Sequence, residues 1–463
     1  MSLLRQLVDA LSHNVSLLEA EYAQDGKNLQ PHLWEAKQFA LLDDVETPTS
    51  SLESFELQQK IIADMEAIKA VITPTCNKLL ELSLCYEKSL MLNLACDLAI
   101  SDAIEEFGGT AHLKELANHV GINEHKLGEY VYQETSPNVF KNTRHSISLL
   151  KKSKAPAFLT FTTDEAMVGS TSIYQNLKSP DTKDSFEAST APFAQAMHLD
   201  GESFFQWVMR PENLKSAIRL GEGVEPWLNA SFRITRSALL YDYPWHEMEG
   251  ITVVDVGCGP ADSAFDIMRQ YPKLAHEWIM QDLPPAIGNL KKARTCRSGV
   301  VLLLIAKLQS IPVDMQEKVE SGAIAFVEQD YFKPNISRGN LWYLRGVIRE
   351  YDDPTAVQVL AQVAKAMRET PGSKMVINEI LTSSPVIVPS SGPSSSIPSV
   401  NIPPRQSLIS GLANLMTWNT YILMGGKERS YNEVQYLLHM AGLKISRFFP
   451  FRTFTMNIEC VPV

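Results

Sequence analysis

From Ile251 onward, short apolar stretches that end in glycine or an acidic residue alternate with amphipathic stretches. The segments ITVVDVGCG, HEWIMQDLP, AIAFVEQDYF, LWYLRGVI and SKMVINEIL are predicted to be strands, and ADSAFDIMRQY and PTAVQVLAQVAKAMRE between them have helical periodicity. Alternating strands and helices predict an α/β domain with a largely parallel sheet. In such sheets, ligands bind at the carboxyl ends of the strands.

The residues before this region are predicted to be helical instead. Apolar residues recur at helical spacing in SLLRQLVDALSHNVSLLEAEYA, in FELQQKIIADMEAIKAVITP and in NKLLELSLCYEKSLMLNLACDLAISDAIEEFGG. Further on, HLKELANHVGINEHKLGEYVYQ contains two short helical stretches around VGIN, and NVFKNTRHSISLL follows in the position of a wing. This order predicts a winged-helix module.

A winged-helix module serves either DNA binding or dimerisation. The chain has 42 Lys and Arg against 53 Asp and Glu, which gives a formal net charge of -11. An acidic surface repels phosphate backbones, and the second predicted helix carries no basic cluster. The sequence therefore favours dimerisation over nucleic-acid binding. We expect a helical and winged-helix dimerisation domain at 1–165 and a catalytic α/β domain at 185–463.

The cysteines and the apolar runs indicate where the protein resides. The six cysteines form no CxxC pair and lie away from histidines at zinc-finger spacing, so we expect reduced thiols and no metal site. The N-terminal residues MSLLRQLVDALSHNVSLLEA lack the continuous apolar core of a signal peptide. The longest apolar run, GVVLLLIA, is too short to span a bilayer. These features predict a cytoplasmic protein without a membrane segment.

Two segments have the character of insertions. Residues 294–320 are long for a connection between two neighbouring strands, and they are either an extra helix or a gene-model artefact. Residues 383–407 are rich in Ser and Pro and have too little apolar surface to fold alone, so we expect a mobile loop there.

Chemistry-bearing residues follow the first two predicted strands. Gly257 and Gly259 come directly after the first strand, where glycine lets the backbone turn sharply and approach a ligand. Position 262, which would complete a G-x-G-x-x-G pattern, is Asp, so a plain tight turn is the competing interpretation. Asp282 ends the second strand, where its carboxylate can accept hydrogen bonds from both hydroxyls of a ribose.

The third predicted strand supplies further groups of this kind. Asp330 can hold an adenine amine, and Tyr331 can stack on the ring. Three strand ends with suitable chemistry predict a nucleoside site. They leave both S-adenosylmethionine and a nicotinamide cofactor open, because both ligands place a ribose beside an acidic residue.

The order of the motifs VVDVGCG, QDLP, EQDYF, LRGVIREYDD, INEIL and GGKERSYNEVQYLLHMAGL resembles the fungal and plant class I O-methyltransferases of the caffeate type. The resemblance covers nearly the whole chain apart from the two insertions. It implies S-adenosylmethionine as cofactor, a Rossmann-like fold, a homodimer and a small-molecule substrate. It adds Arg345 to the expected cofactor site, and it places Ala261 where the family has a glycine.

In that family, a histidine removes a proton from the substrate hydroxyl, and two glutamates flank the histidine. The resemblance places Arg349 at the position of the base and Glu379 and Glu428 at the positions of the glutamates, while Glu350 replaces an Asp. Arginine stays protonated and cannot act as a general base. It can donate hydrogen bonds to an oxygen that gains negative charge. The two glutamates can pair with it and fix its orientation.

This exchange resembles the O-methyltransferase-like pericyclases of pyridone biosynthesis, which keep S-adenosylmethionine bound and catalyse dehydration and ring closure. In those enzymes a histidine of the N-terminal domain helps to hold the substrate, and His145 is the corresponding candidate, with a surface histidine as the competing interpretation. His198 lies in a segment that often faces the substrate in the family, although most such histidines are structural. Met416, Trp418 and Met424 are expected to be helix core and to wall the acceptor pocket.

Three functions are compatible with these residues. The first is a pericyclase or dehydratase-cyclase acting on a polyketide- or pyridone-type substrate of fungal secondary metabolism. The second is an O-methyltransferase acting on an acidic hydroxyl or carboxyl group that is already ionised. The third is a non-catalytic subunit of a biosynthetic complex, which the glycines and Asp282 disfavour because a scaffold has no need of a cofactor.

Overall fold

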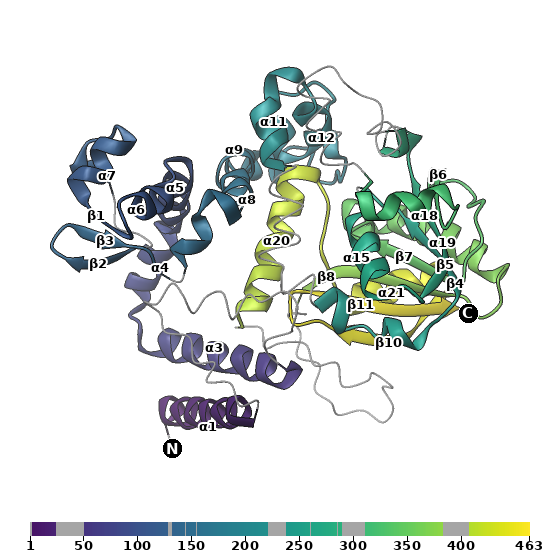
Figure 1. Ribbon diagram of the computed structural model, residues 1–463, viewed down its shortest axis with the longest axis horizontal. Coiled ribbons are helices and arrows are strands. Elements are labelled where there is room, and N and C mark those ends of the chain that lie inside the picture. The colour runs from purple at the N-terminus through teal and green to yellow at the C-terminus, as the bar shows by residue number, and fades with distance from the viewer. Residues whose placement is uncertain are drawn as a thin grey trace. The chain divides into compact units, whose positions relative to one another are not determined.

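The computed structural model (Figure 1) describes residues 2–24, 51–127, 132–143, 145–153, 155–220, 238–259, 261–284, 286–288, 311–382 and 407–463. Two compact units share these residues. Unit 1 contains 1–168, 215–237 and 406–408, and unit 2 contains 169–214, 238–405 and 409–463. Most of the first predicted insertion and all but the last residue of the second lie outside the described residues. The domain limits expected at 165 and 185 stay a prediction.

Unit 1 begins with helices. These are α1 (Leu3–Gln24), α3 (Leu52–Ile72), α4 (Thr75–Ser83), α5 (Cys85–Asp97), α6 (Ile100–Glu106), α7 (Leu113–Val120) and α8 (Ala155–Thr163), and α9 (Glu165–Ser170) crosses into unit 2. Helix α3 starts where the Ser51 side chain accepts a hydrogen bond from the Ser54 backbone N–H, an ordinary N-cap. Helices α1 and α3 are joined by a 2.8 Å hydrogen bond from Asn14 to Asp64.

A small antiparallel sheet completes unit 1. Strands β1 (Thr110–His112), β2 (Gln133–Ser136) and β3 (Val139–Lys141) lie in the order β1-β3-β2, and α7 follows β1 directly. Helix α7 ends at Gly121, which has the left-handed φ of 72°. In the stretch after VGIN, where a second short helix is expected, the structure describes a 3-10 turn at Glu124–Lys126 and extended backbone at Leu127. Residues 128–131 lie outside the described residues, so the second helix stays a prediction.

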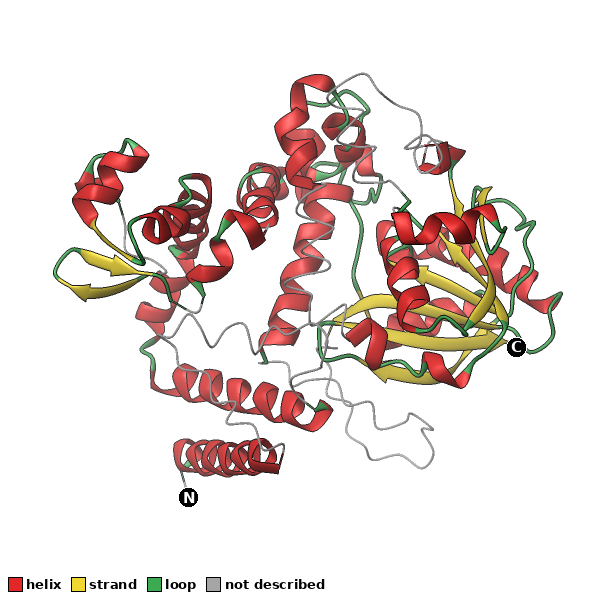
Figure 2. Cartoon of the chain, in the orientation of Figure 1, coloured by secondary structure: helices red, strands yellow, loops and turns green. Residues whose placement is uncertain are grey.

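Unit 2 is built on one mixed sheet with the strand order β10-β11-β8-β7-β4-β5-β6 (Figure 2). The strands are β4 (Ile251–Val256), β5 (Ala275–Asp282), β6 (Ile324–Glu328), β7 (Leu341–Arg345), β8 (Lys374–Thr382), β9 (Arg429–Ser430), β10 (Leu443–Pro450) and β11 (Thr455–Pro462). The five expected strands pair in parallel as β6, β5, β4, β7 and β8. Strands β10 and β11 add an antiparallel edge that the sequence pattern did not predict.

Helices pack on both faces of this sheet. The described α-helices after α9 are α10 (Ile173–Lys178), α11 (Pro192–Ala196), α12 (Phe204–Val208), α15 (Asp262–Gln270), α18 (Gln316–Glu320), α19 (Asp353–Arg368), α20 (Leu408–Met424) and α21 (Tyr431–Met440). The α19 and α21 side chains form one core with one face of β4, β7 and β8, and α15 forms a second core with the opposite face. The architecture is therefore the predicted α/β class, with a Rossmann-like domain after a helical N-terminal region.

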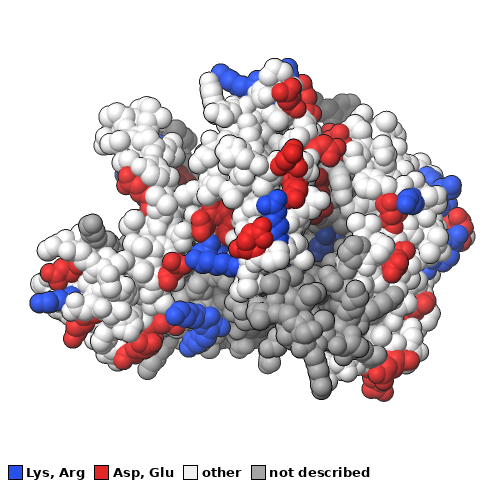
Figure 3. Space-filling view, turned by 90° about the horizontal axis from the view of Figure 1, so that it is seen from above, with Lys and Arg blue, Asp and Glu red and all other residues white. Residues whose placement is uncertain are grey.

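Among the described residues, no helix has both the length and the apolar character that a membrane crossing requires. Within the same residues, no group of three or more His, Cys, Asp or Glu side chains is arranged to hold a metal ion. On the face shown in Figure 3, the described Lys and Arg side chains occur in small groups among Asp and Glu side chains. The basic stripe typical of a nucleic-acid interface is therefore missing from the described part of that face.

Candidate active site

The loop after β4 needs its glycines. Gly257 has a φ of 71° and Gly259 a φ of 53°, values that L residues rarely adopt. A Cβ atom on Gly257 would lie 3.1 Å from a methyl group of Val347. The backbone N–H groups of Gly257 and Cys258 donate to the Gln281 carbonyl oxygen at 2.9 and 3.0 Å. These bonds hold the loop against the end of β5, as expected for a ligand-binding turn.

Asp282 ties the same loop to β5 through its carboxylate. One oxygen accepts the Gly259 backbone N–H at 2.9 Å, and the other accepts the Leu283 N–H at 2.7 Å. Each carboxylate oxygen can accept more than one hydrogen bond, so acceptor capacity remains for a ligand hydroxyl. Ala261, where the related family has glycine, adopts a left-handed φ of 62° and precedes α15. The loop therefore keeps its shape although Ala carries a Cβ.

Aromatic and acidic side chains continue the site beyond β6. The Tyr331 and Tyr351 hydroxyl groups are hydrogen-bonded, and both rings make edge contacts with Phe332. Burial and the Tyr351 hydroxyl raise the pKa of Tyr331, so it stays a neutral phenol. The Asp330 carboxylate accepts the Phe332 N–H at 3.0 Å and pairs with Lys333 at 3.5 Å.

Asp255, near the end of β4, is a buried acid that the sequence reasoning missed. Burial, and then the nearby charge of Asp282, raise its pKa to about 7, while Arg345 acts in the opposite direction. The Arg345 guanidinium donates to the Ser263 hydroxyl at 2.5 Å. The sequence feature that could have identified Asp255 is an acidic residue inside the apolar stretch VVDVG. Carboxylates at the ends of β4 and β5, together with glycines of positive φ, fit a cationic nucleoside ligand.

Arg349 lies on the 3-10 turn Ile348–Glu350 that follows β7. Its Nη2 atom donates to the Thr420 hydroxyl and forms an ion pair with Glu428 Oε1. The Thr420 hydroxyl in turn donates to the same Glu428 oxygen at 2.8 Å. The Arg349 side chain is 17% exposed and that of Glu428 is 1% exposed. Glu428 and Thr420 therefore hold the Arg349 guanidinium in place, and part of the Arg349 side chain remains accessible to solvent.

Glu379, on β8, is the second carboxyl group near Arg349. Its Oε1 accepts the Ile348 backbone N–H at 3.0 Å, and its Oε2 has no hydrogen-bond partner. Burial, and then the Glu428 charge, raise the pKa of Glu379 to about 8, although Arg349 opposes the rise. Burial also raises the pKa of Glu428, again against Arg349. Arg349 is the permanent cation of this set, and Glu379 is mostly protonated at neutral pH.

Three unpartnered buried atoms meet in this set: Arg349 Nε, Glu379 Oε2 and Glu428 Oε2. Buried polar atoms without partners are rare, and they cluster where a ligand or water completes the bonding. Glu350, the next residue, has its pKa raised to about 7 by burial, with Arg349 opposing and Asp282 adding to the rise. The described residues of unit 2 therefore place a strongly perturbed group of titratable side chains beside the expected cofactor loop.

Helix α20 contributes the hydroxyl that sequence reasoning did not select. Met416, Thr420 and Met424 follow one another at intervals of four residues, so they share one face of the helix. Because Thr420 bonds to Arg349, the two methionines lie on the face directed toward that residue. Trp418 is 50% exposed and contacts the Tyr421 ring. A lone polar residue at helical spacing between the two methionines was the signal for Thr420.

Neither candidate histidine is among the residues described above as bonded to Arg349, Glu379 or Glu428. His198 in unit 2 is exposed and has a left-handed φ of 51°, just after α11. His145 belongs to unit 1, where it is exposed, and its backbone N–H donates to the Thr143 hydroxyl at 3.2 Å. Roles for both histidines stay predictions.

Replacing Glu379 with glutamine is expected to flatten the pH dependence of stability. A carboxyl group with a folded-state pKa of about 8 and an ordinary value of 4.5 binds its proton more tightly in the folded state. The free energy of unfolding therefore falls as pH rises from about 4.5 to about 8. We expect urea unfolding of the wild type to lose about 2 kcal/mol more than Glu379→Gln between pH 6 and pH 8. Parallel profiles would show that Glu379 is already ionised at pH 6.

Comparisons with known proteins agree with this geometry. Residues 224–444 match the model of the O-methyltransferase domain family. The chain is 24% identical over 387 residues to 3-O-methyltransferase 2 of Phanerochaete chrysosporium, covering 81% of this chain and 79% of the relative. The fold matches human N-acetylserotonin methyltransferase in complex with SAM, with a TM-score of 0.59, 15% identity and coverage of 84% of this chain and 99% of that one.

A second solved structure has a different activity. It is described as a pericyclic reaction enzyme, and it matches with a TM-score of 0.62 and 16% identity over 92% of this chain and 97% of its own. At such identities the likeness shows the fold alone. The chain therefore contains a region, residues 224–444, that matches the O-methyltransferase domain family, and it has the fold of the class I O-methyltransferases.

Proposed function

We propose that the protein binds S-adenosylmethionine and acts as a pericyclase or dehydratase-cyclase on a polyketide- or pyridone-type substrate of fungal secondary metabolism. The observation that supports this proposal is Arg349, which stands at the position of the family's base and is bonded to Glu428 and Thr420. A guanidinium keeps its proton at any accessible pH, so the group beside the substrate is a donor.

The cofactor site follows from the strand ends. Gly257 and Gly259 allow the backbone to approach the ligand, Asp282 accepts from the ribose, and Asp330, Tyr331 and Arg345 complete the site. When bound, S-adenosylmethionine supplies a sulfonium cation and a transferable methyl group. The carboxylates of Asp282, Asp255 and Glu350 favour a cation at this place, because each is stabilised by a nearby positive charge.

The proposed chemistry needs no base of the family type. Arg349 donates a hydrogen bond to a substrate carbonyl oxygen and stabilises the negative charge that develops there. Dehydration breaks a C–O bond, and the departing hydroxyl leaves as water with a proton from the substrate. The following ring closure redistributes π electrons within the product, so the mass does not change further. Glu428 and Thr420 keep the guanidinium oriented throughout.

An O-methyltransferase is the second candidate. Two observations favour it: the curated fungal relative is an O-methyltransferase, and Glu379 has a pKa of about 8, within reach of proton transfer near neutral pH. Its substrate would carry an acidic hydroxyl or carboxyl group, which Arg349 would bind as an anion.

The residues proposed to bind the substrate include side chains of α20 near Arg349. Met416 and Met424 share the face of α20 that carries Thr420 and are proposed to wall the acceptor pocket, with Trp418 nearby on the helix. His198 and His145 are proposed to contact the substrate, His145 through the N-terminal unit.

The N-terminal unit is proposed to carry a winged helix and to form a homodimer, with exposed Leu79, Leu80 and Leu82 on α4 as part of the interface. If this is so, the Leu79→Glu variant should be a monomer, and light scattering measures its mass in solution.

The decisive assay incubates the purified protein with S-adenosylmethionine and hydroxylated polyketide or pyridone substrates. The proposal predicts a product lighter by one water, or of unchanged mass. A product heavier by one methylene group would favour the second candidate. The cytoplasmic location is a separate proposal that fractionation of the producing cell tests.

A further inference from the structure

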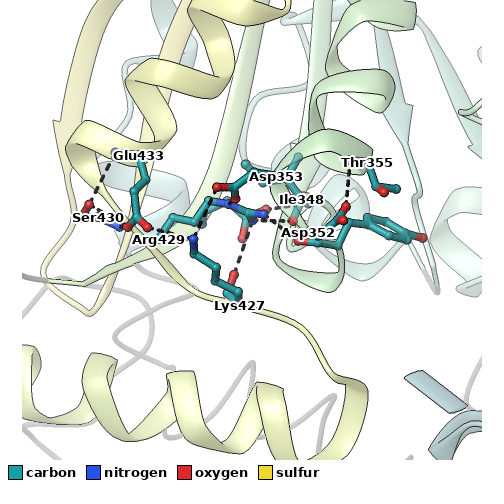
Figure 4. A network of polar contacts seen from close by, with 10 residues as sticks. Ile348, Asp352, Asp353, Thr355, Lys427, Arg429, Ser430 and Glu433 are labelled. Carbon is teal, nitrogen blue, oxygen red and sulfur yellow. Dashed lines mark hydrogen bonds and ion pairs between the residues drawn. The ribbon is translucent and has the colours of Figure 1, made fainter. Parts of the chain in front are cut away.

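We infer that Arg429 is a positioning residue that fixes the backbone of residue 349 whatever side chain residue 349 carries. The inference concerns how the site is built, and it holds for either proposed reaction. It rests on a network of contacts between the segment Gly425–Ser430 and the turn after β7, shown in Figure 4.

Arg429 holds both ends of that turn. Its side chain is 2% exposed. Its Nη1 donates to the Ile348 carbonyl oxygen at 2.7 Å and its Nη2 to the Tyr351 carbonyl oxygen at 2.6 Å, as Figure 4 shows for Ile348. These two carbonyl groups flank Arg349 on either side. A planar guanidinium presents its donors in a fixed fork, so the distance and direction between the two carbonyl groups are set by one side chain.

The segment around Arg429 also contacts the backbone of residue 349 itself. The Lys427 N–H donates to the Arg349 carbonyl oxygen at 2.8 Å. A Cβ atom on Gly426 would overlap the same carbonyl oxygen and would crowd the Glu350 Cα at 3.2 Å. Each of these contacts involves main-chain atoms of the turn. The position of residue 349 is therefore fixed through backbone groups that every amino acid presents.

Arg429 is itself anchored by the starts of two helices. Its Nε donates to Asp353 at 2.9 Å, in the first turn of α19, whose N-cap Asp352 accepts the Thr355 N–H at 2.9 Å. On the other side, Ser430 caps α21 together with Glu433. A buried charge needs a partner, and Asp353 supplies it. The clamp is thus part of the rigid framework of unit 2.

The neighbouring residue completes the arrangement. Glu428 pairs with the Arg349 side chain, while Arg429, the next residue along the chain, binds the backbone on both sides of residue 349. Glu428 therefore orients the side chain of residue 349, and Arg429 positions its backbone. A histidine introduced at position 349 should accordingly be held between Glu379 and Glu428 without any other change in the chain.

The test measures an imidazole pKa and uses no substrate, so its failure leaves the proposed function untouched. The full-length Arg349→His variant adds one imidazole to the ten native histidines, and carbon-detected NMR of labelled histidine follows its titration. We expect its pKa to lie above the ordinary value of about 6.5, because the Glu428 carboxylate stabilises the imidazolium. In Arg349→His/Arg429→Lys we expect that pKa to fall by about one unit, because lysine lacks the fork and the imidazole moves away.

A matched control separates positioning from general destabilisation. Arg452 is also a buried arginine, and it bonds to Asp242 in unit 2. Arg349→His/Arg452→Lys should keep the pKa of Arg349→His. If the lysine variant at position 429 does not fold, Gly426→Ala displaces the Arg349 carbonyl group without changing any charge and should lower the pKa in the same way. An ordinary pKa in Arg349→His alone, or an equal pKa in all backgrounds, would overturn the inference.

Discussion

Replacing Arg349 with methionine is expected to lower turnover by about 10²–10³-fold, the loss typical of removing one preorganised donor to a developing oxyanion. Methionine has a similar length but no donor, so the substrate oxygen would lose its partner. The buried Glu428 and Glu379 would also be left without the cation that stabilises their ionised forms. Both pKa values should rise further.

The same variant should unfold at lower urea concentration. Removing one partner of a mostly buried ion pair destabilises proteins by about 3 kcal/mol, and protonation of the remaining carboxyl groups recovers part of that. Arg447→Met is the control, because Arg447 pairs with Glu247 at the surface and its loss should change stability by less than about 1 kcal/mol. Full turnover in Arg349→Met at saturating substrate would remove Arg349 from the chemistry.

The second large effect is expected at the cofactor loop. Asp282→Ala should weaken S-adenosylmethionine binding by at least about 100-fold, since each hydrogen bond to a charged group contributes about 1.5–3 kcal/mol and two are lost. The substitution also removes the acceptor of the Gly259 N–H, which the loop needs for its shape. Isothermal titration calorimetry with S-adenosylmethionine measures the change directly.

Asp314→Ala is the matched control for this experiment. Asp314 is an exposed acid of unit 2 that pairs with Arg269 at 2.7 Å, so its removal changes the net charge equally without touching the loop. Its affinity for S-adenosylmethionine should equal that of the wild type. An equal loss of affinity in both variants would mean that overall charge, rather than the Asp282 carboxylate, governs cofactor binding.

Strands β4 and β7 could be predicted because they lie inside the sheet. β4 and β7 are buried on both faces, and such strands appear in a sequence as continuous apolar runs. β10 pairs on one side only, and its letters LKISRFFP mix apolar residues with charged ones. A mixed pattern of this kind is compatible with either a strand or a loop, so the antiparallel edge of the sheet was not predicted.

The candidate site was predictable where one motif carries the residue. Arg349, Glu379 and Glu428 each stand in a short stretch that resembles the family. Thr420 and Arg429 were missed because their roles depend on contacts with partners 71 and 81 residues away in the chain. The perturbed pKa values of Asp255 and Glu350 likewise depend on burial, which letters alone do not give.

The central claim is that the methyl group of S-adenosylmethionine is not transferred while the substrate undergoes dehydration or ring closure. The most direct measurement incubates the protein with methyl-labelled S-adenosylmethionine and substrate over many turnovers, and follows both compounds by mass spectrometry. The account predicts intact labelled cofactor and a product of unchanged mass, or lighter by one water. Labelled product formed in step with S-adenosylhomocysteine would contradict it and would assign the site to methyl transfer.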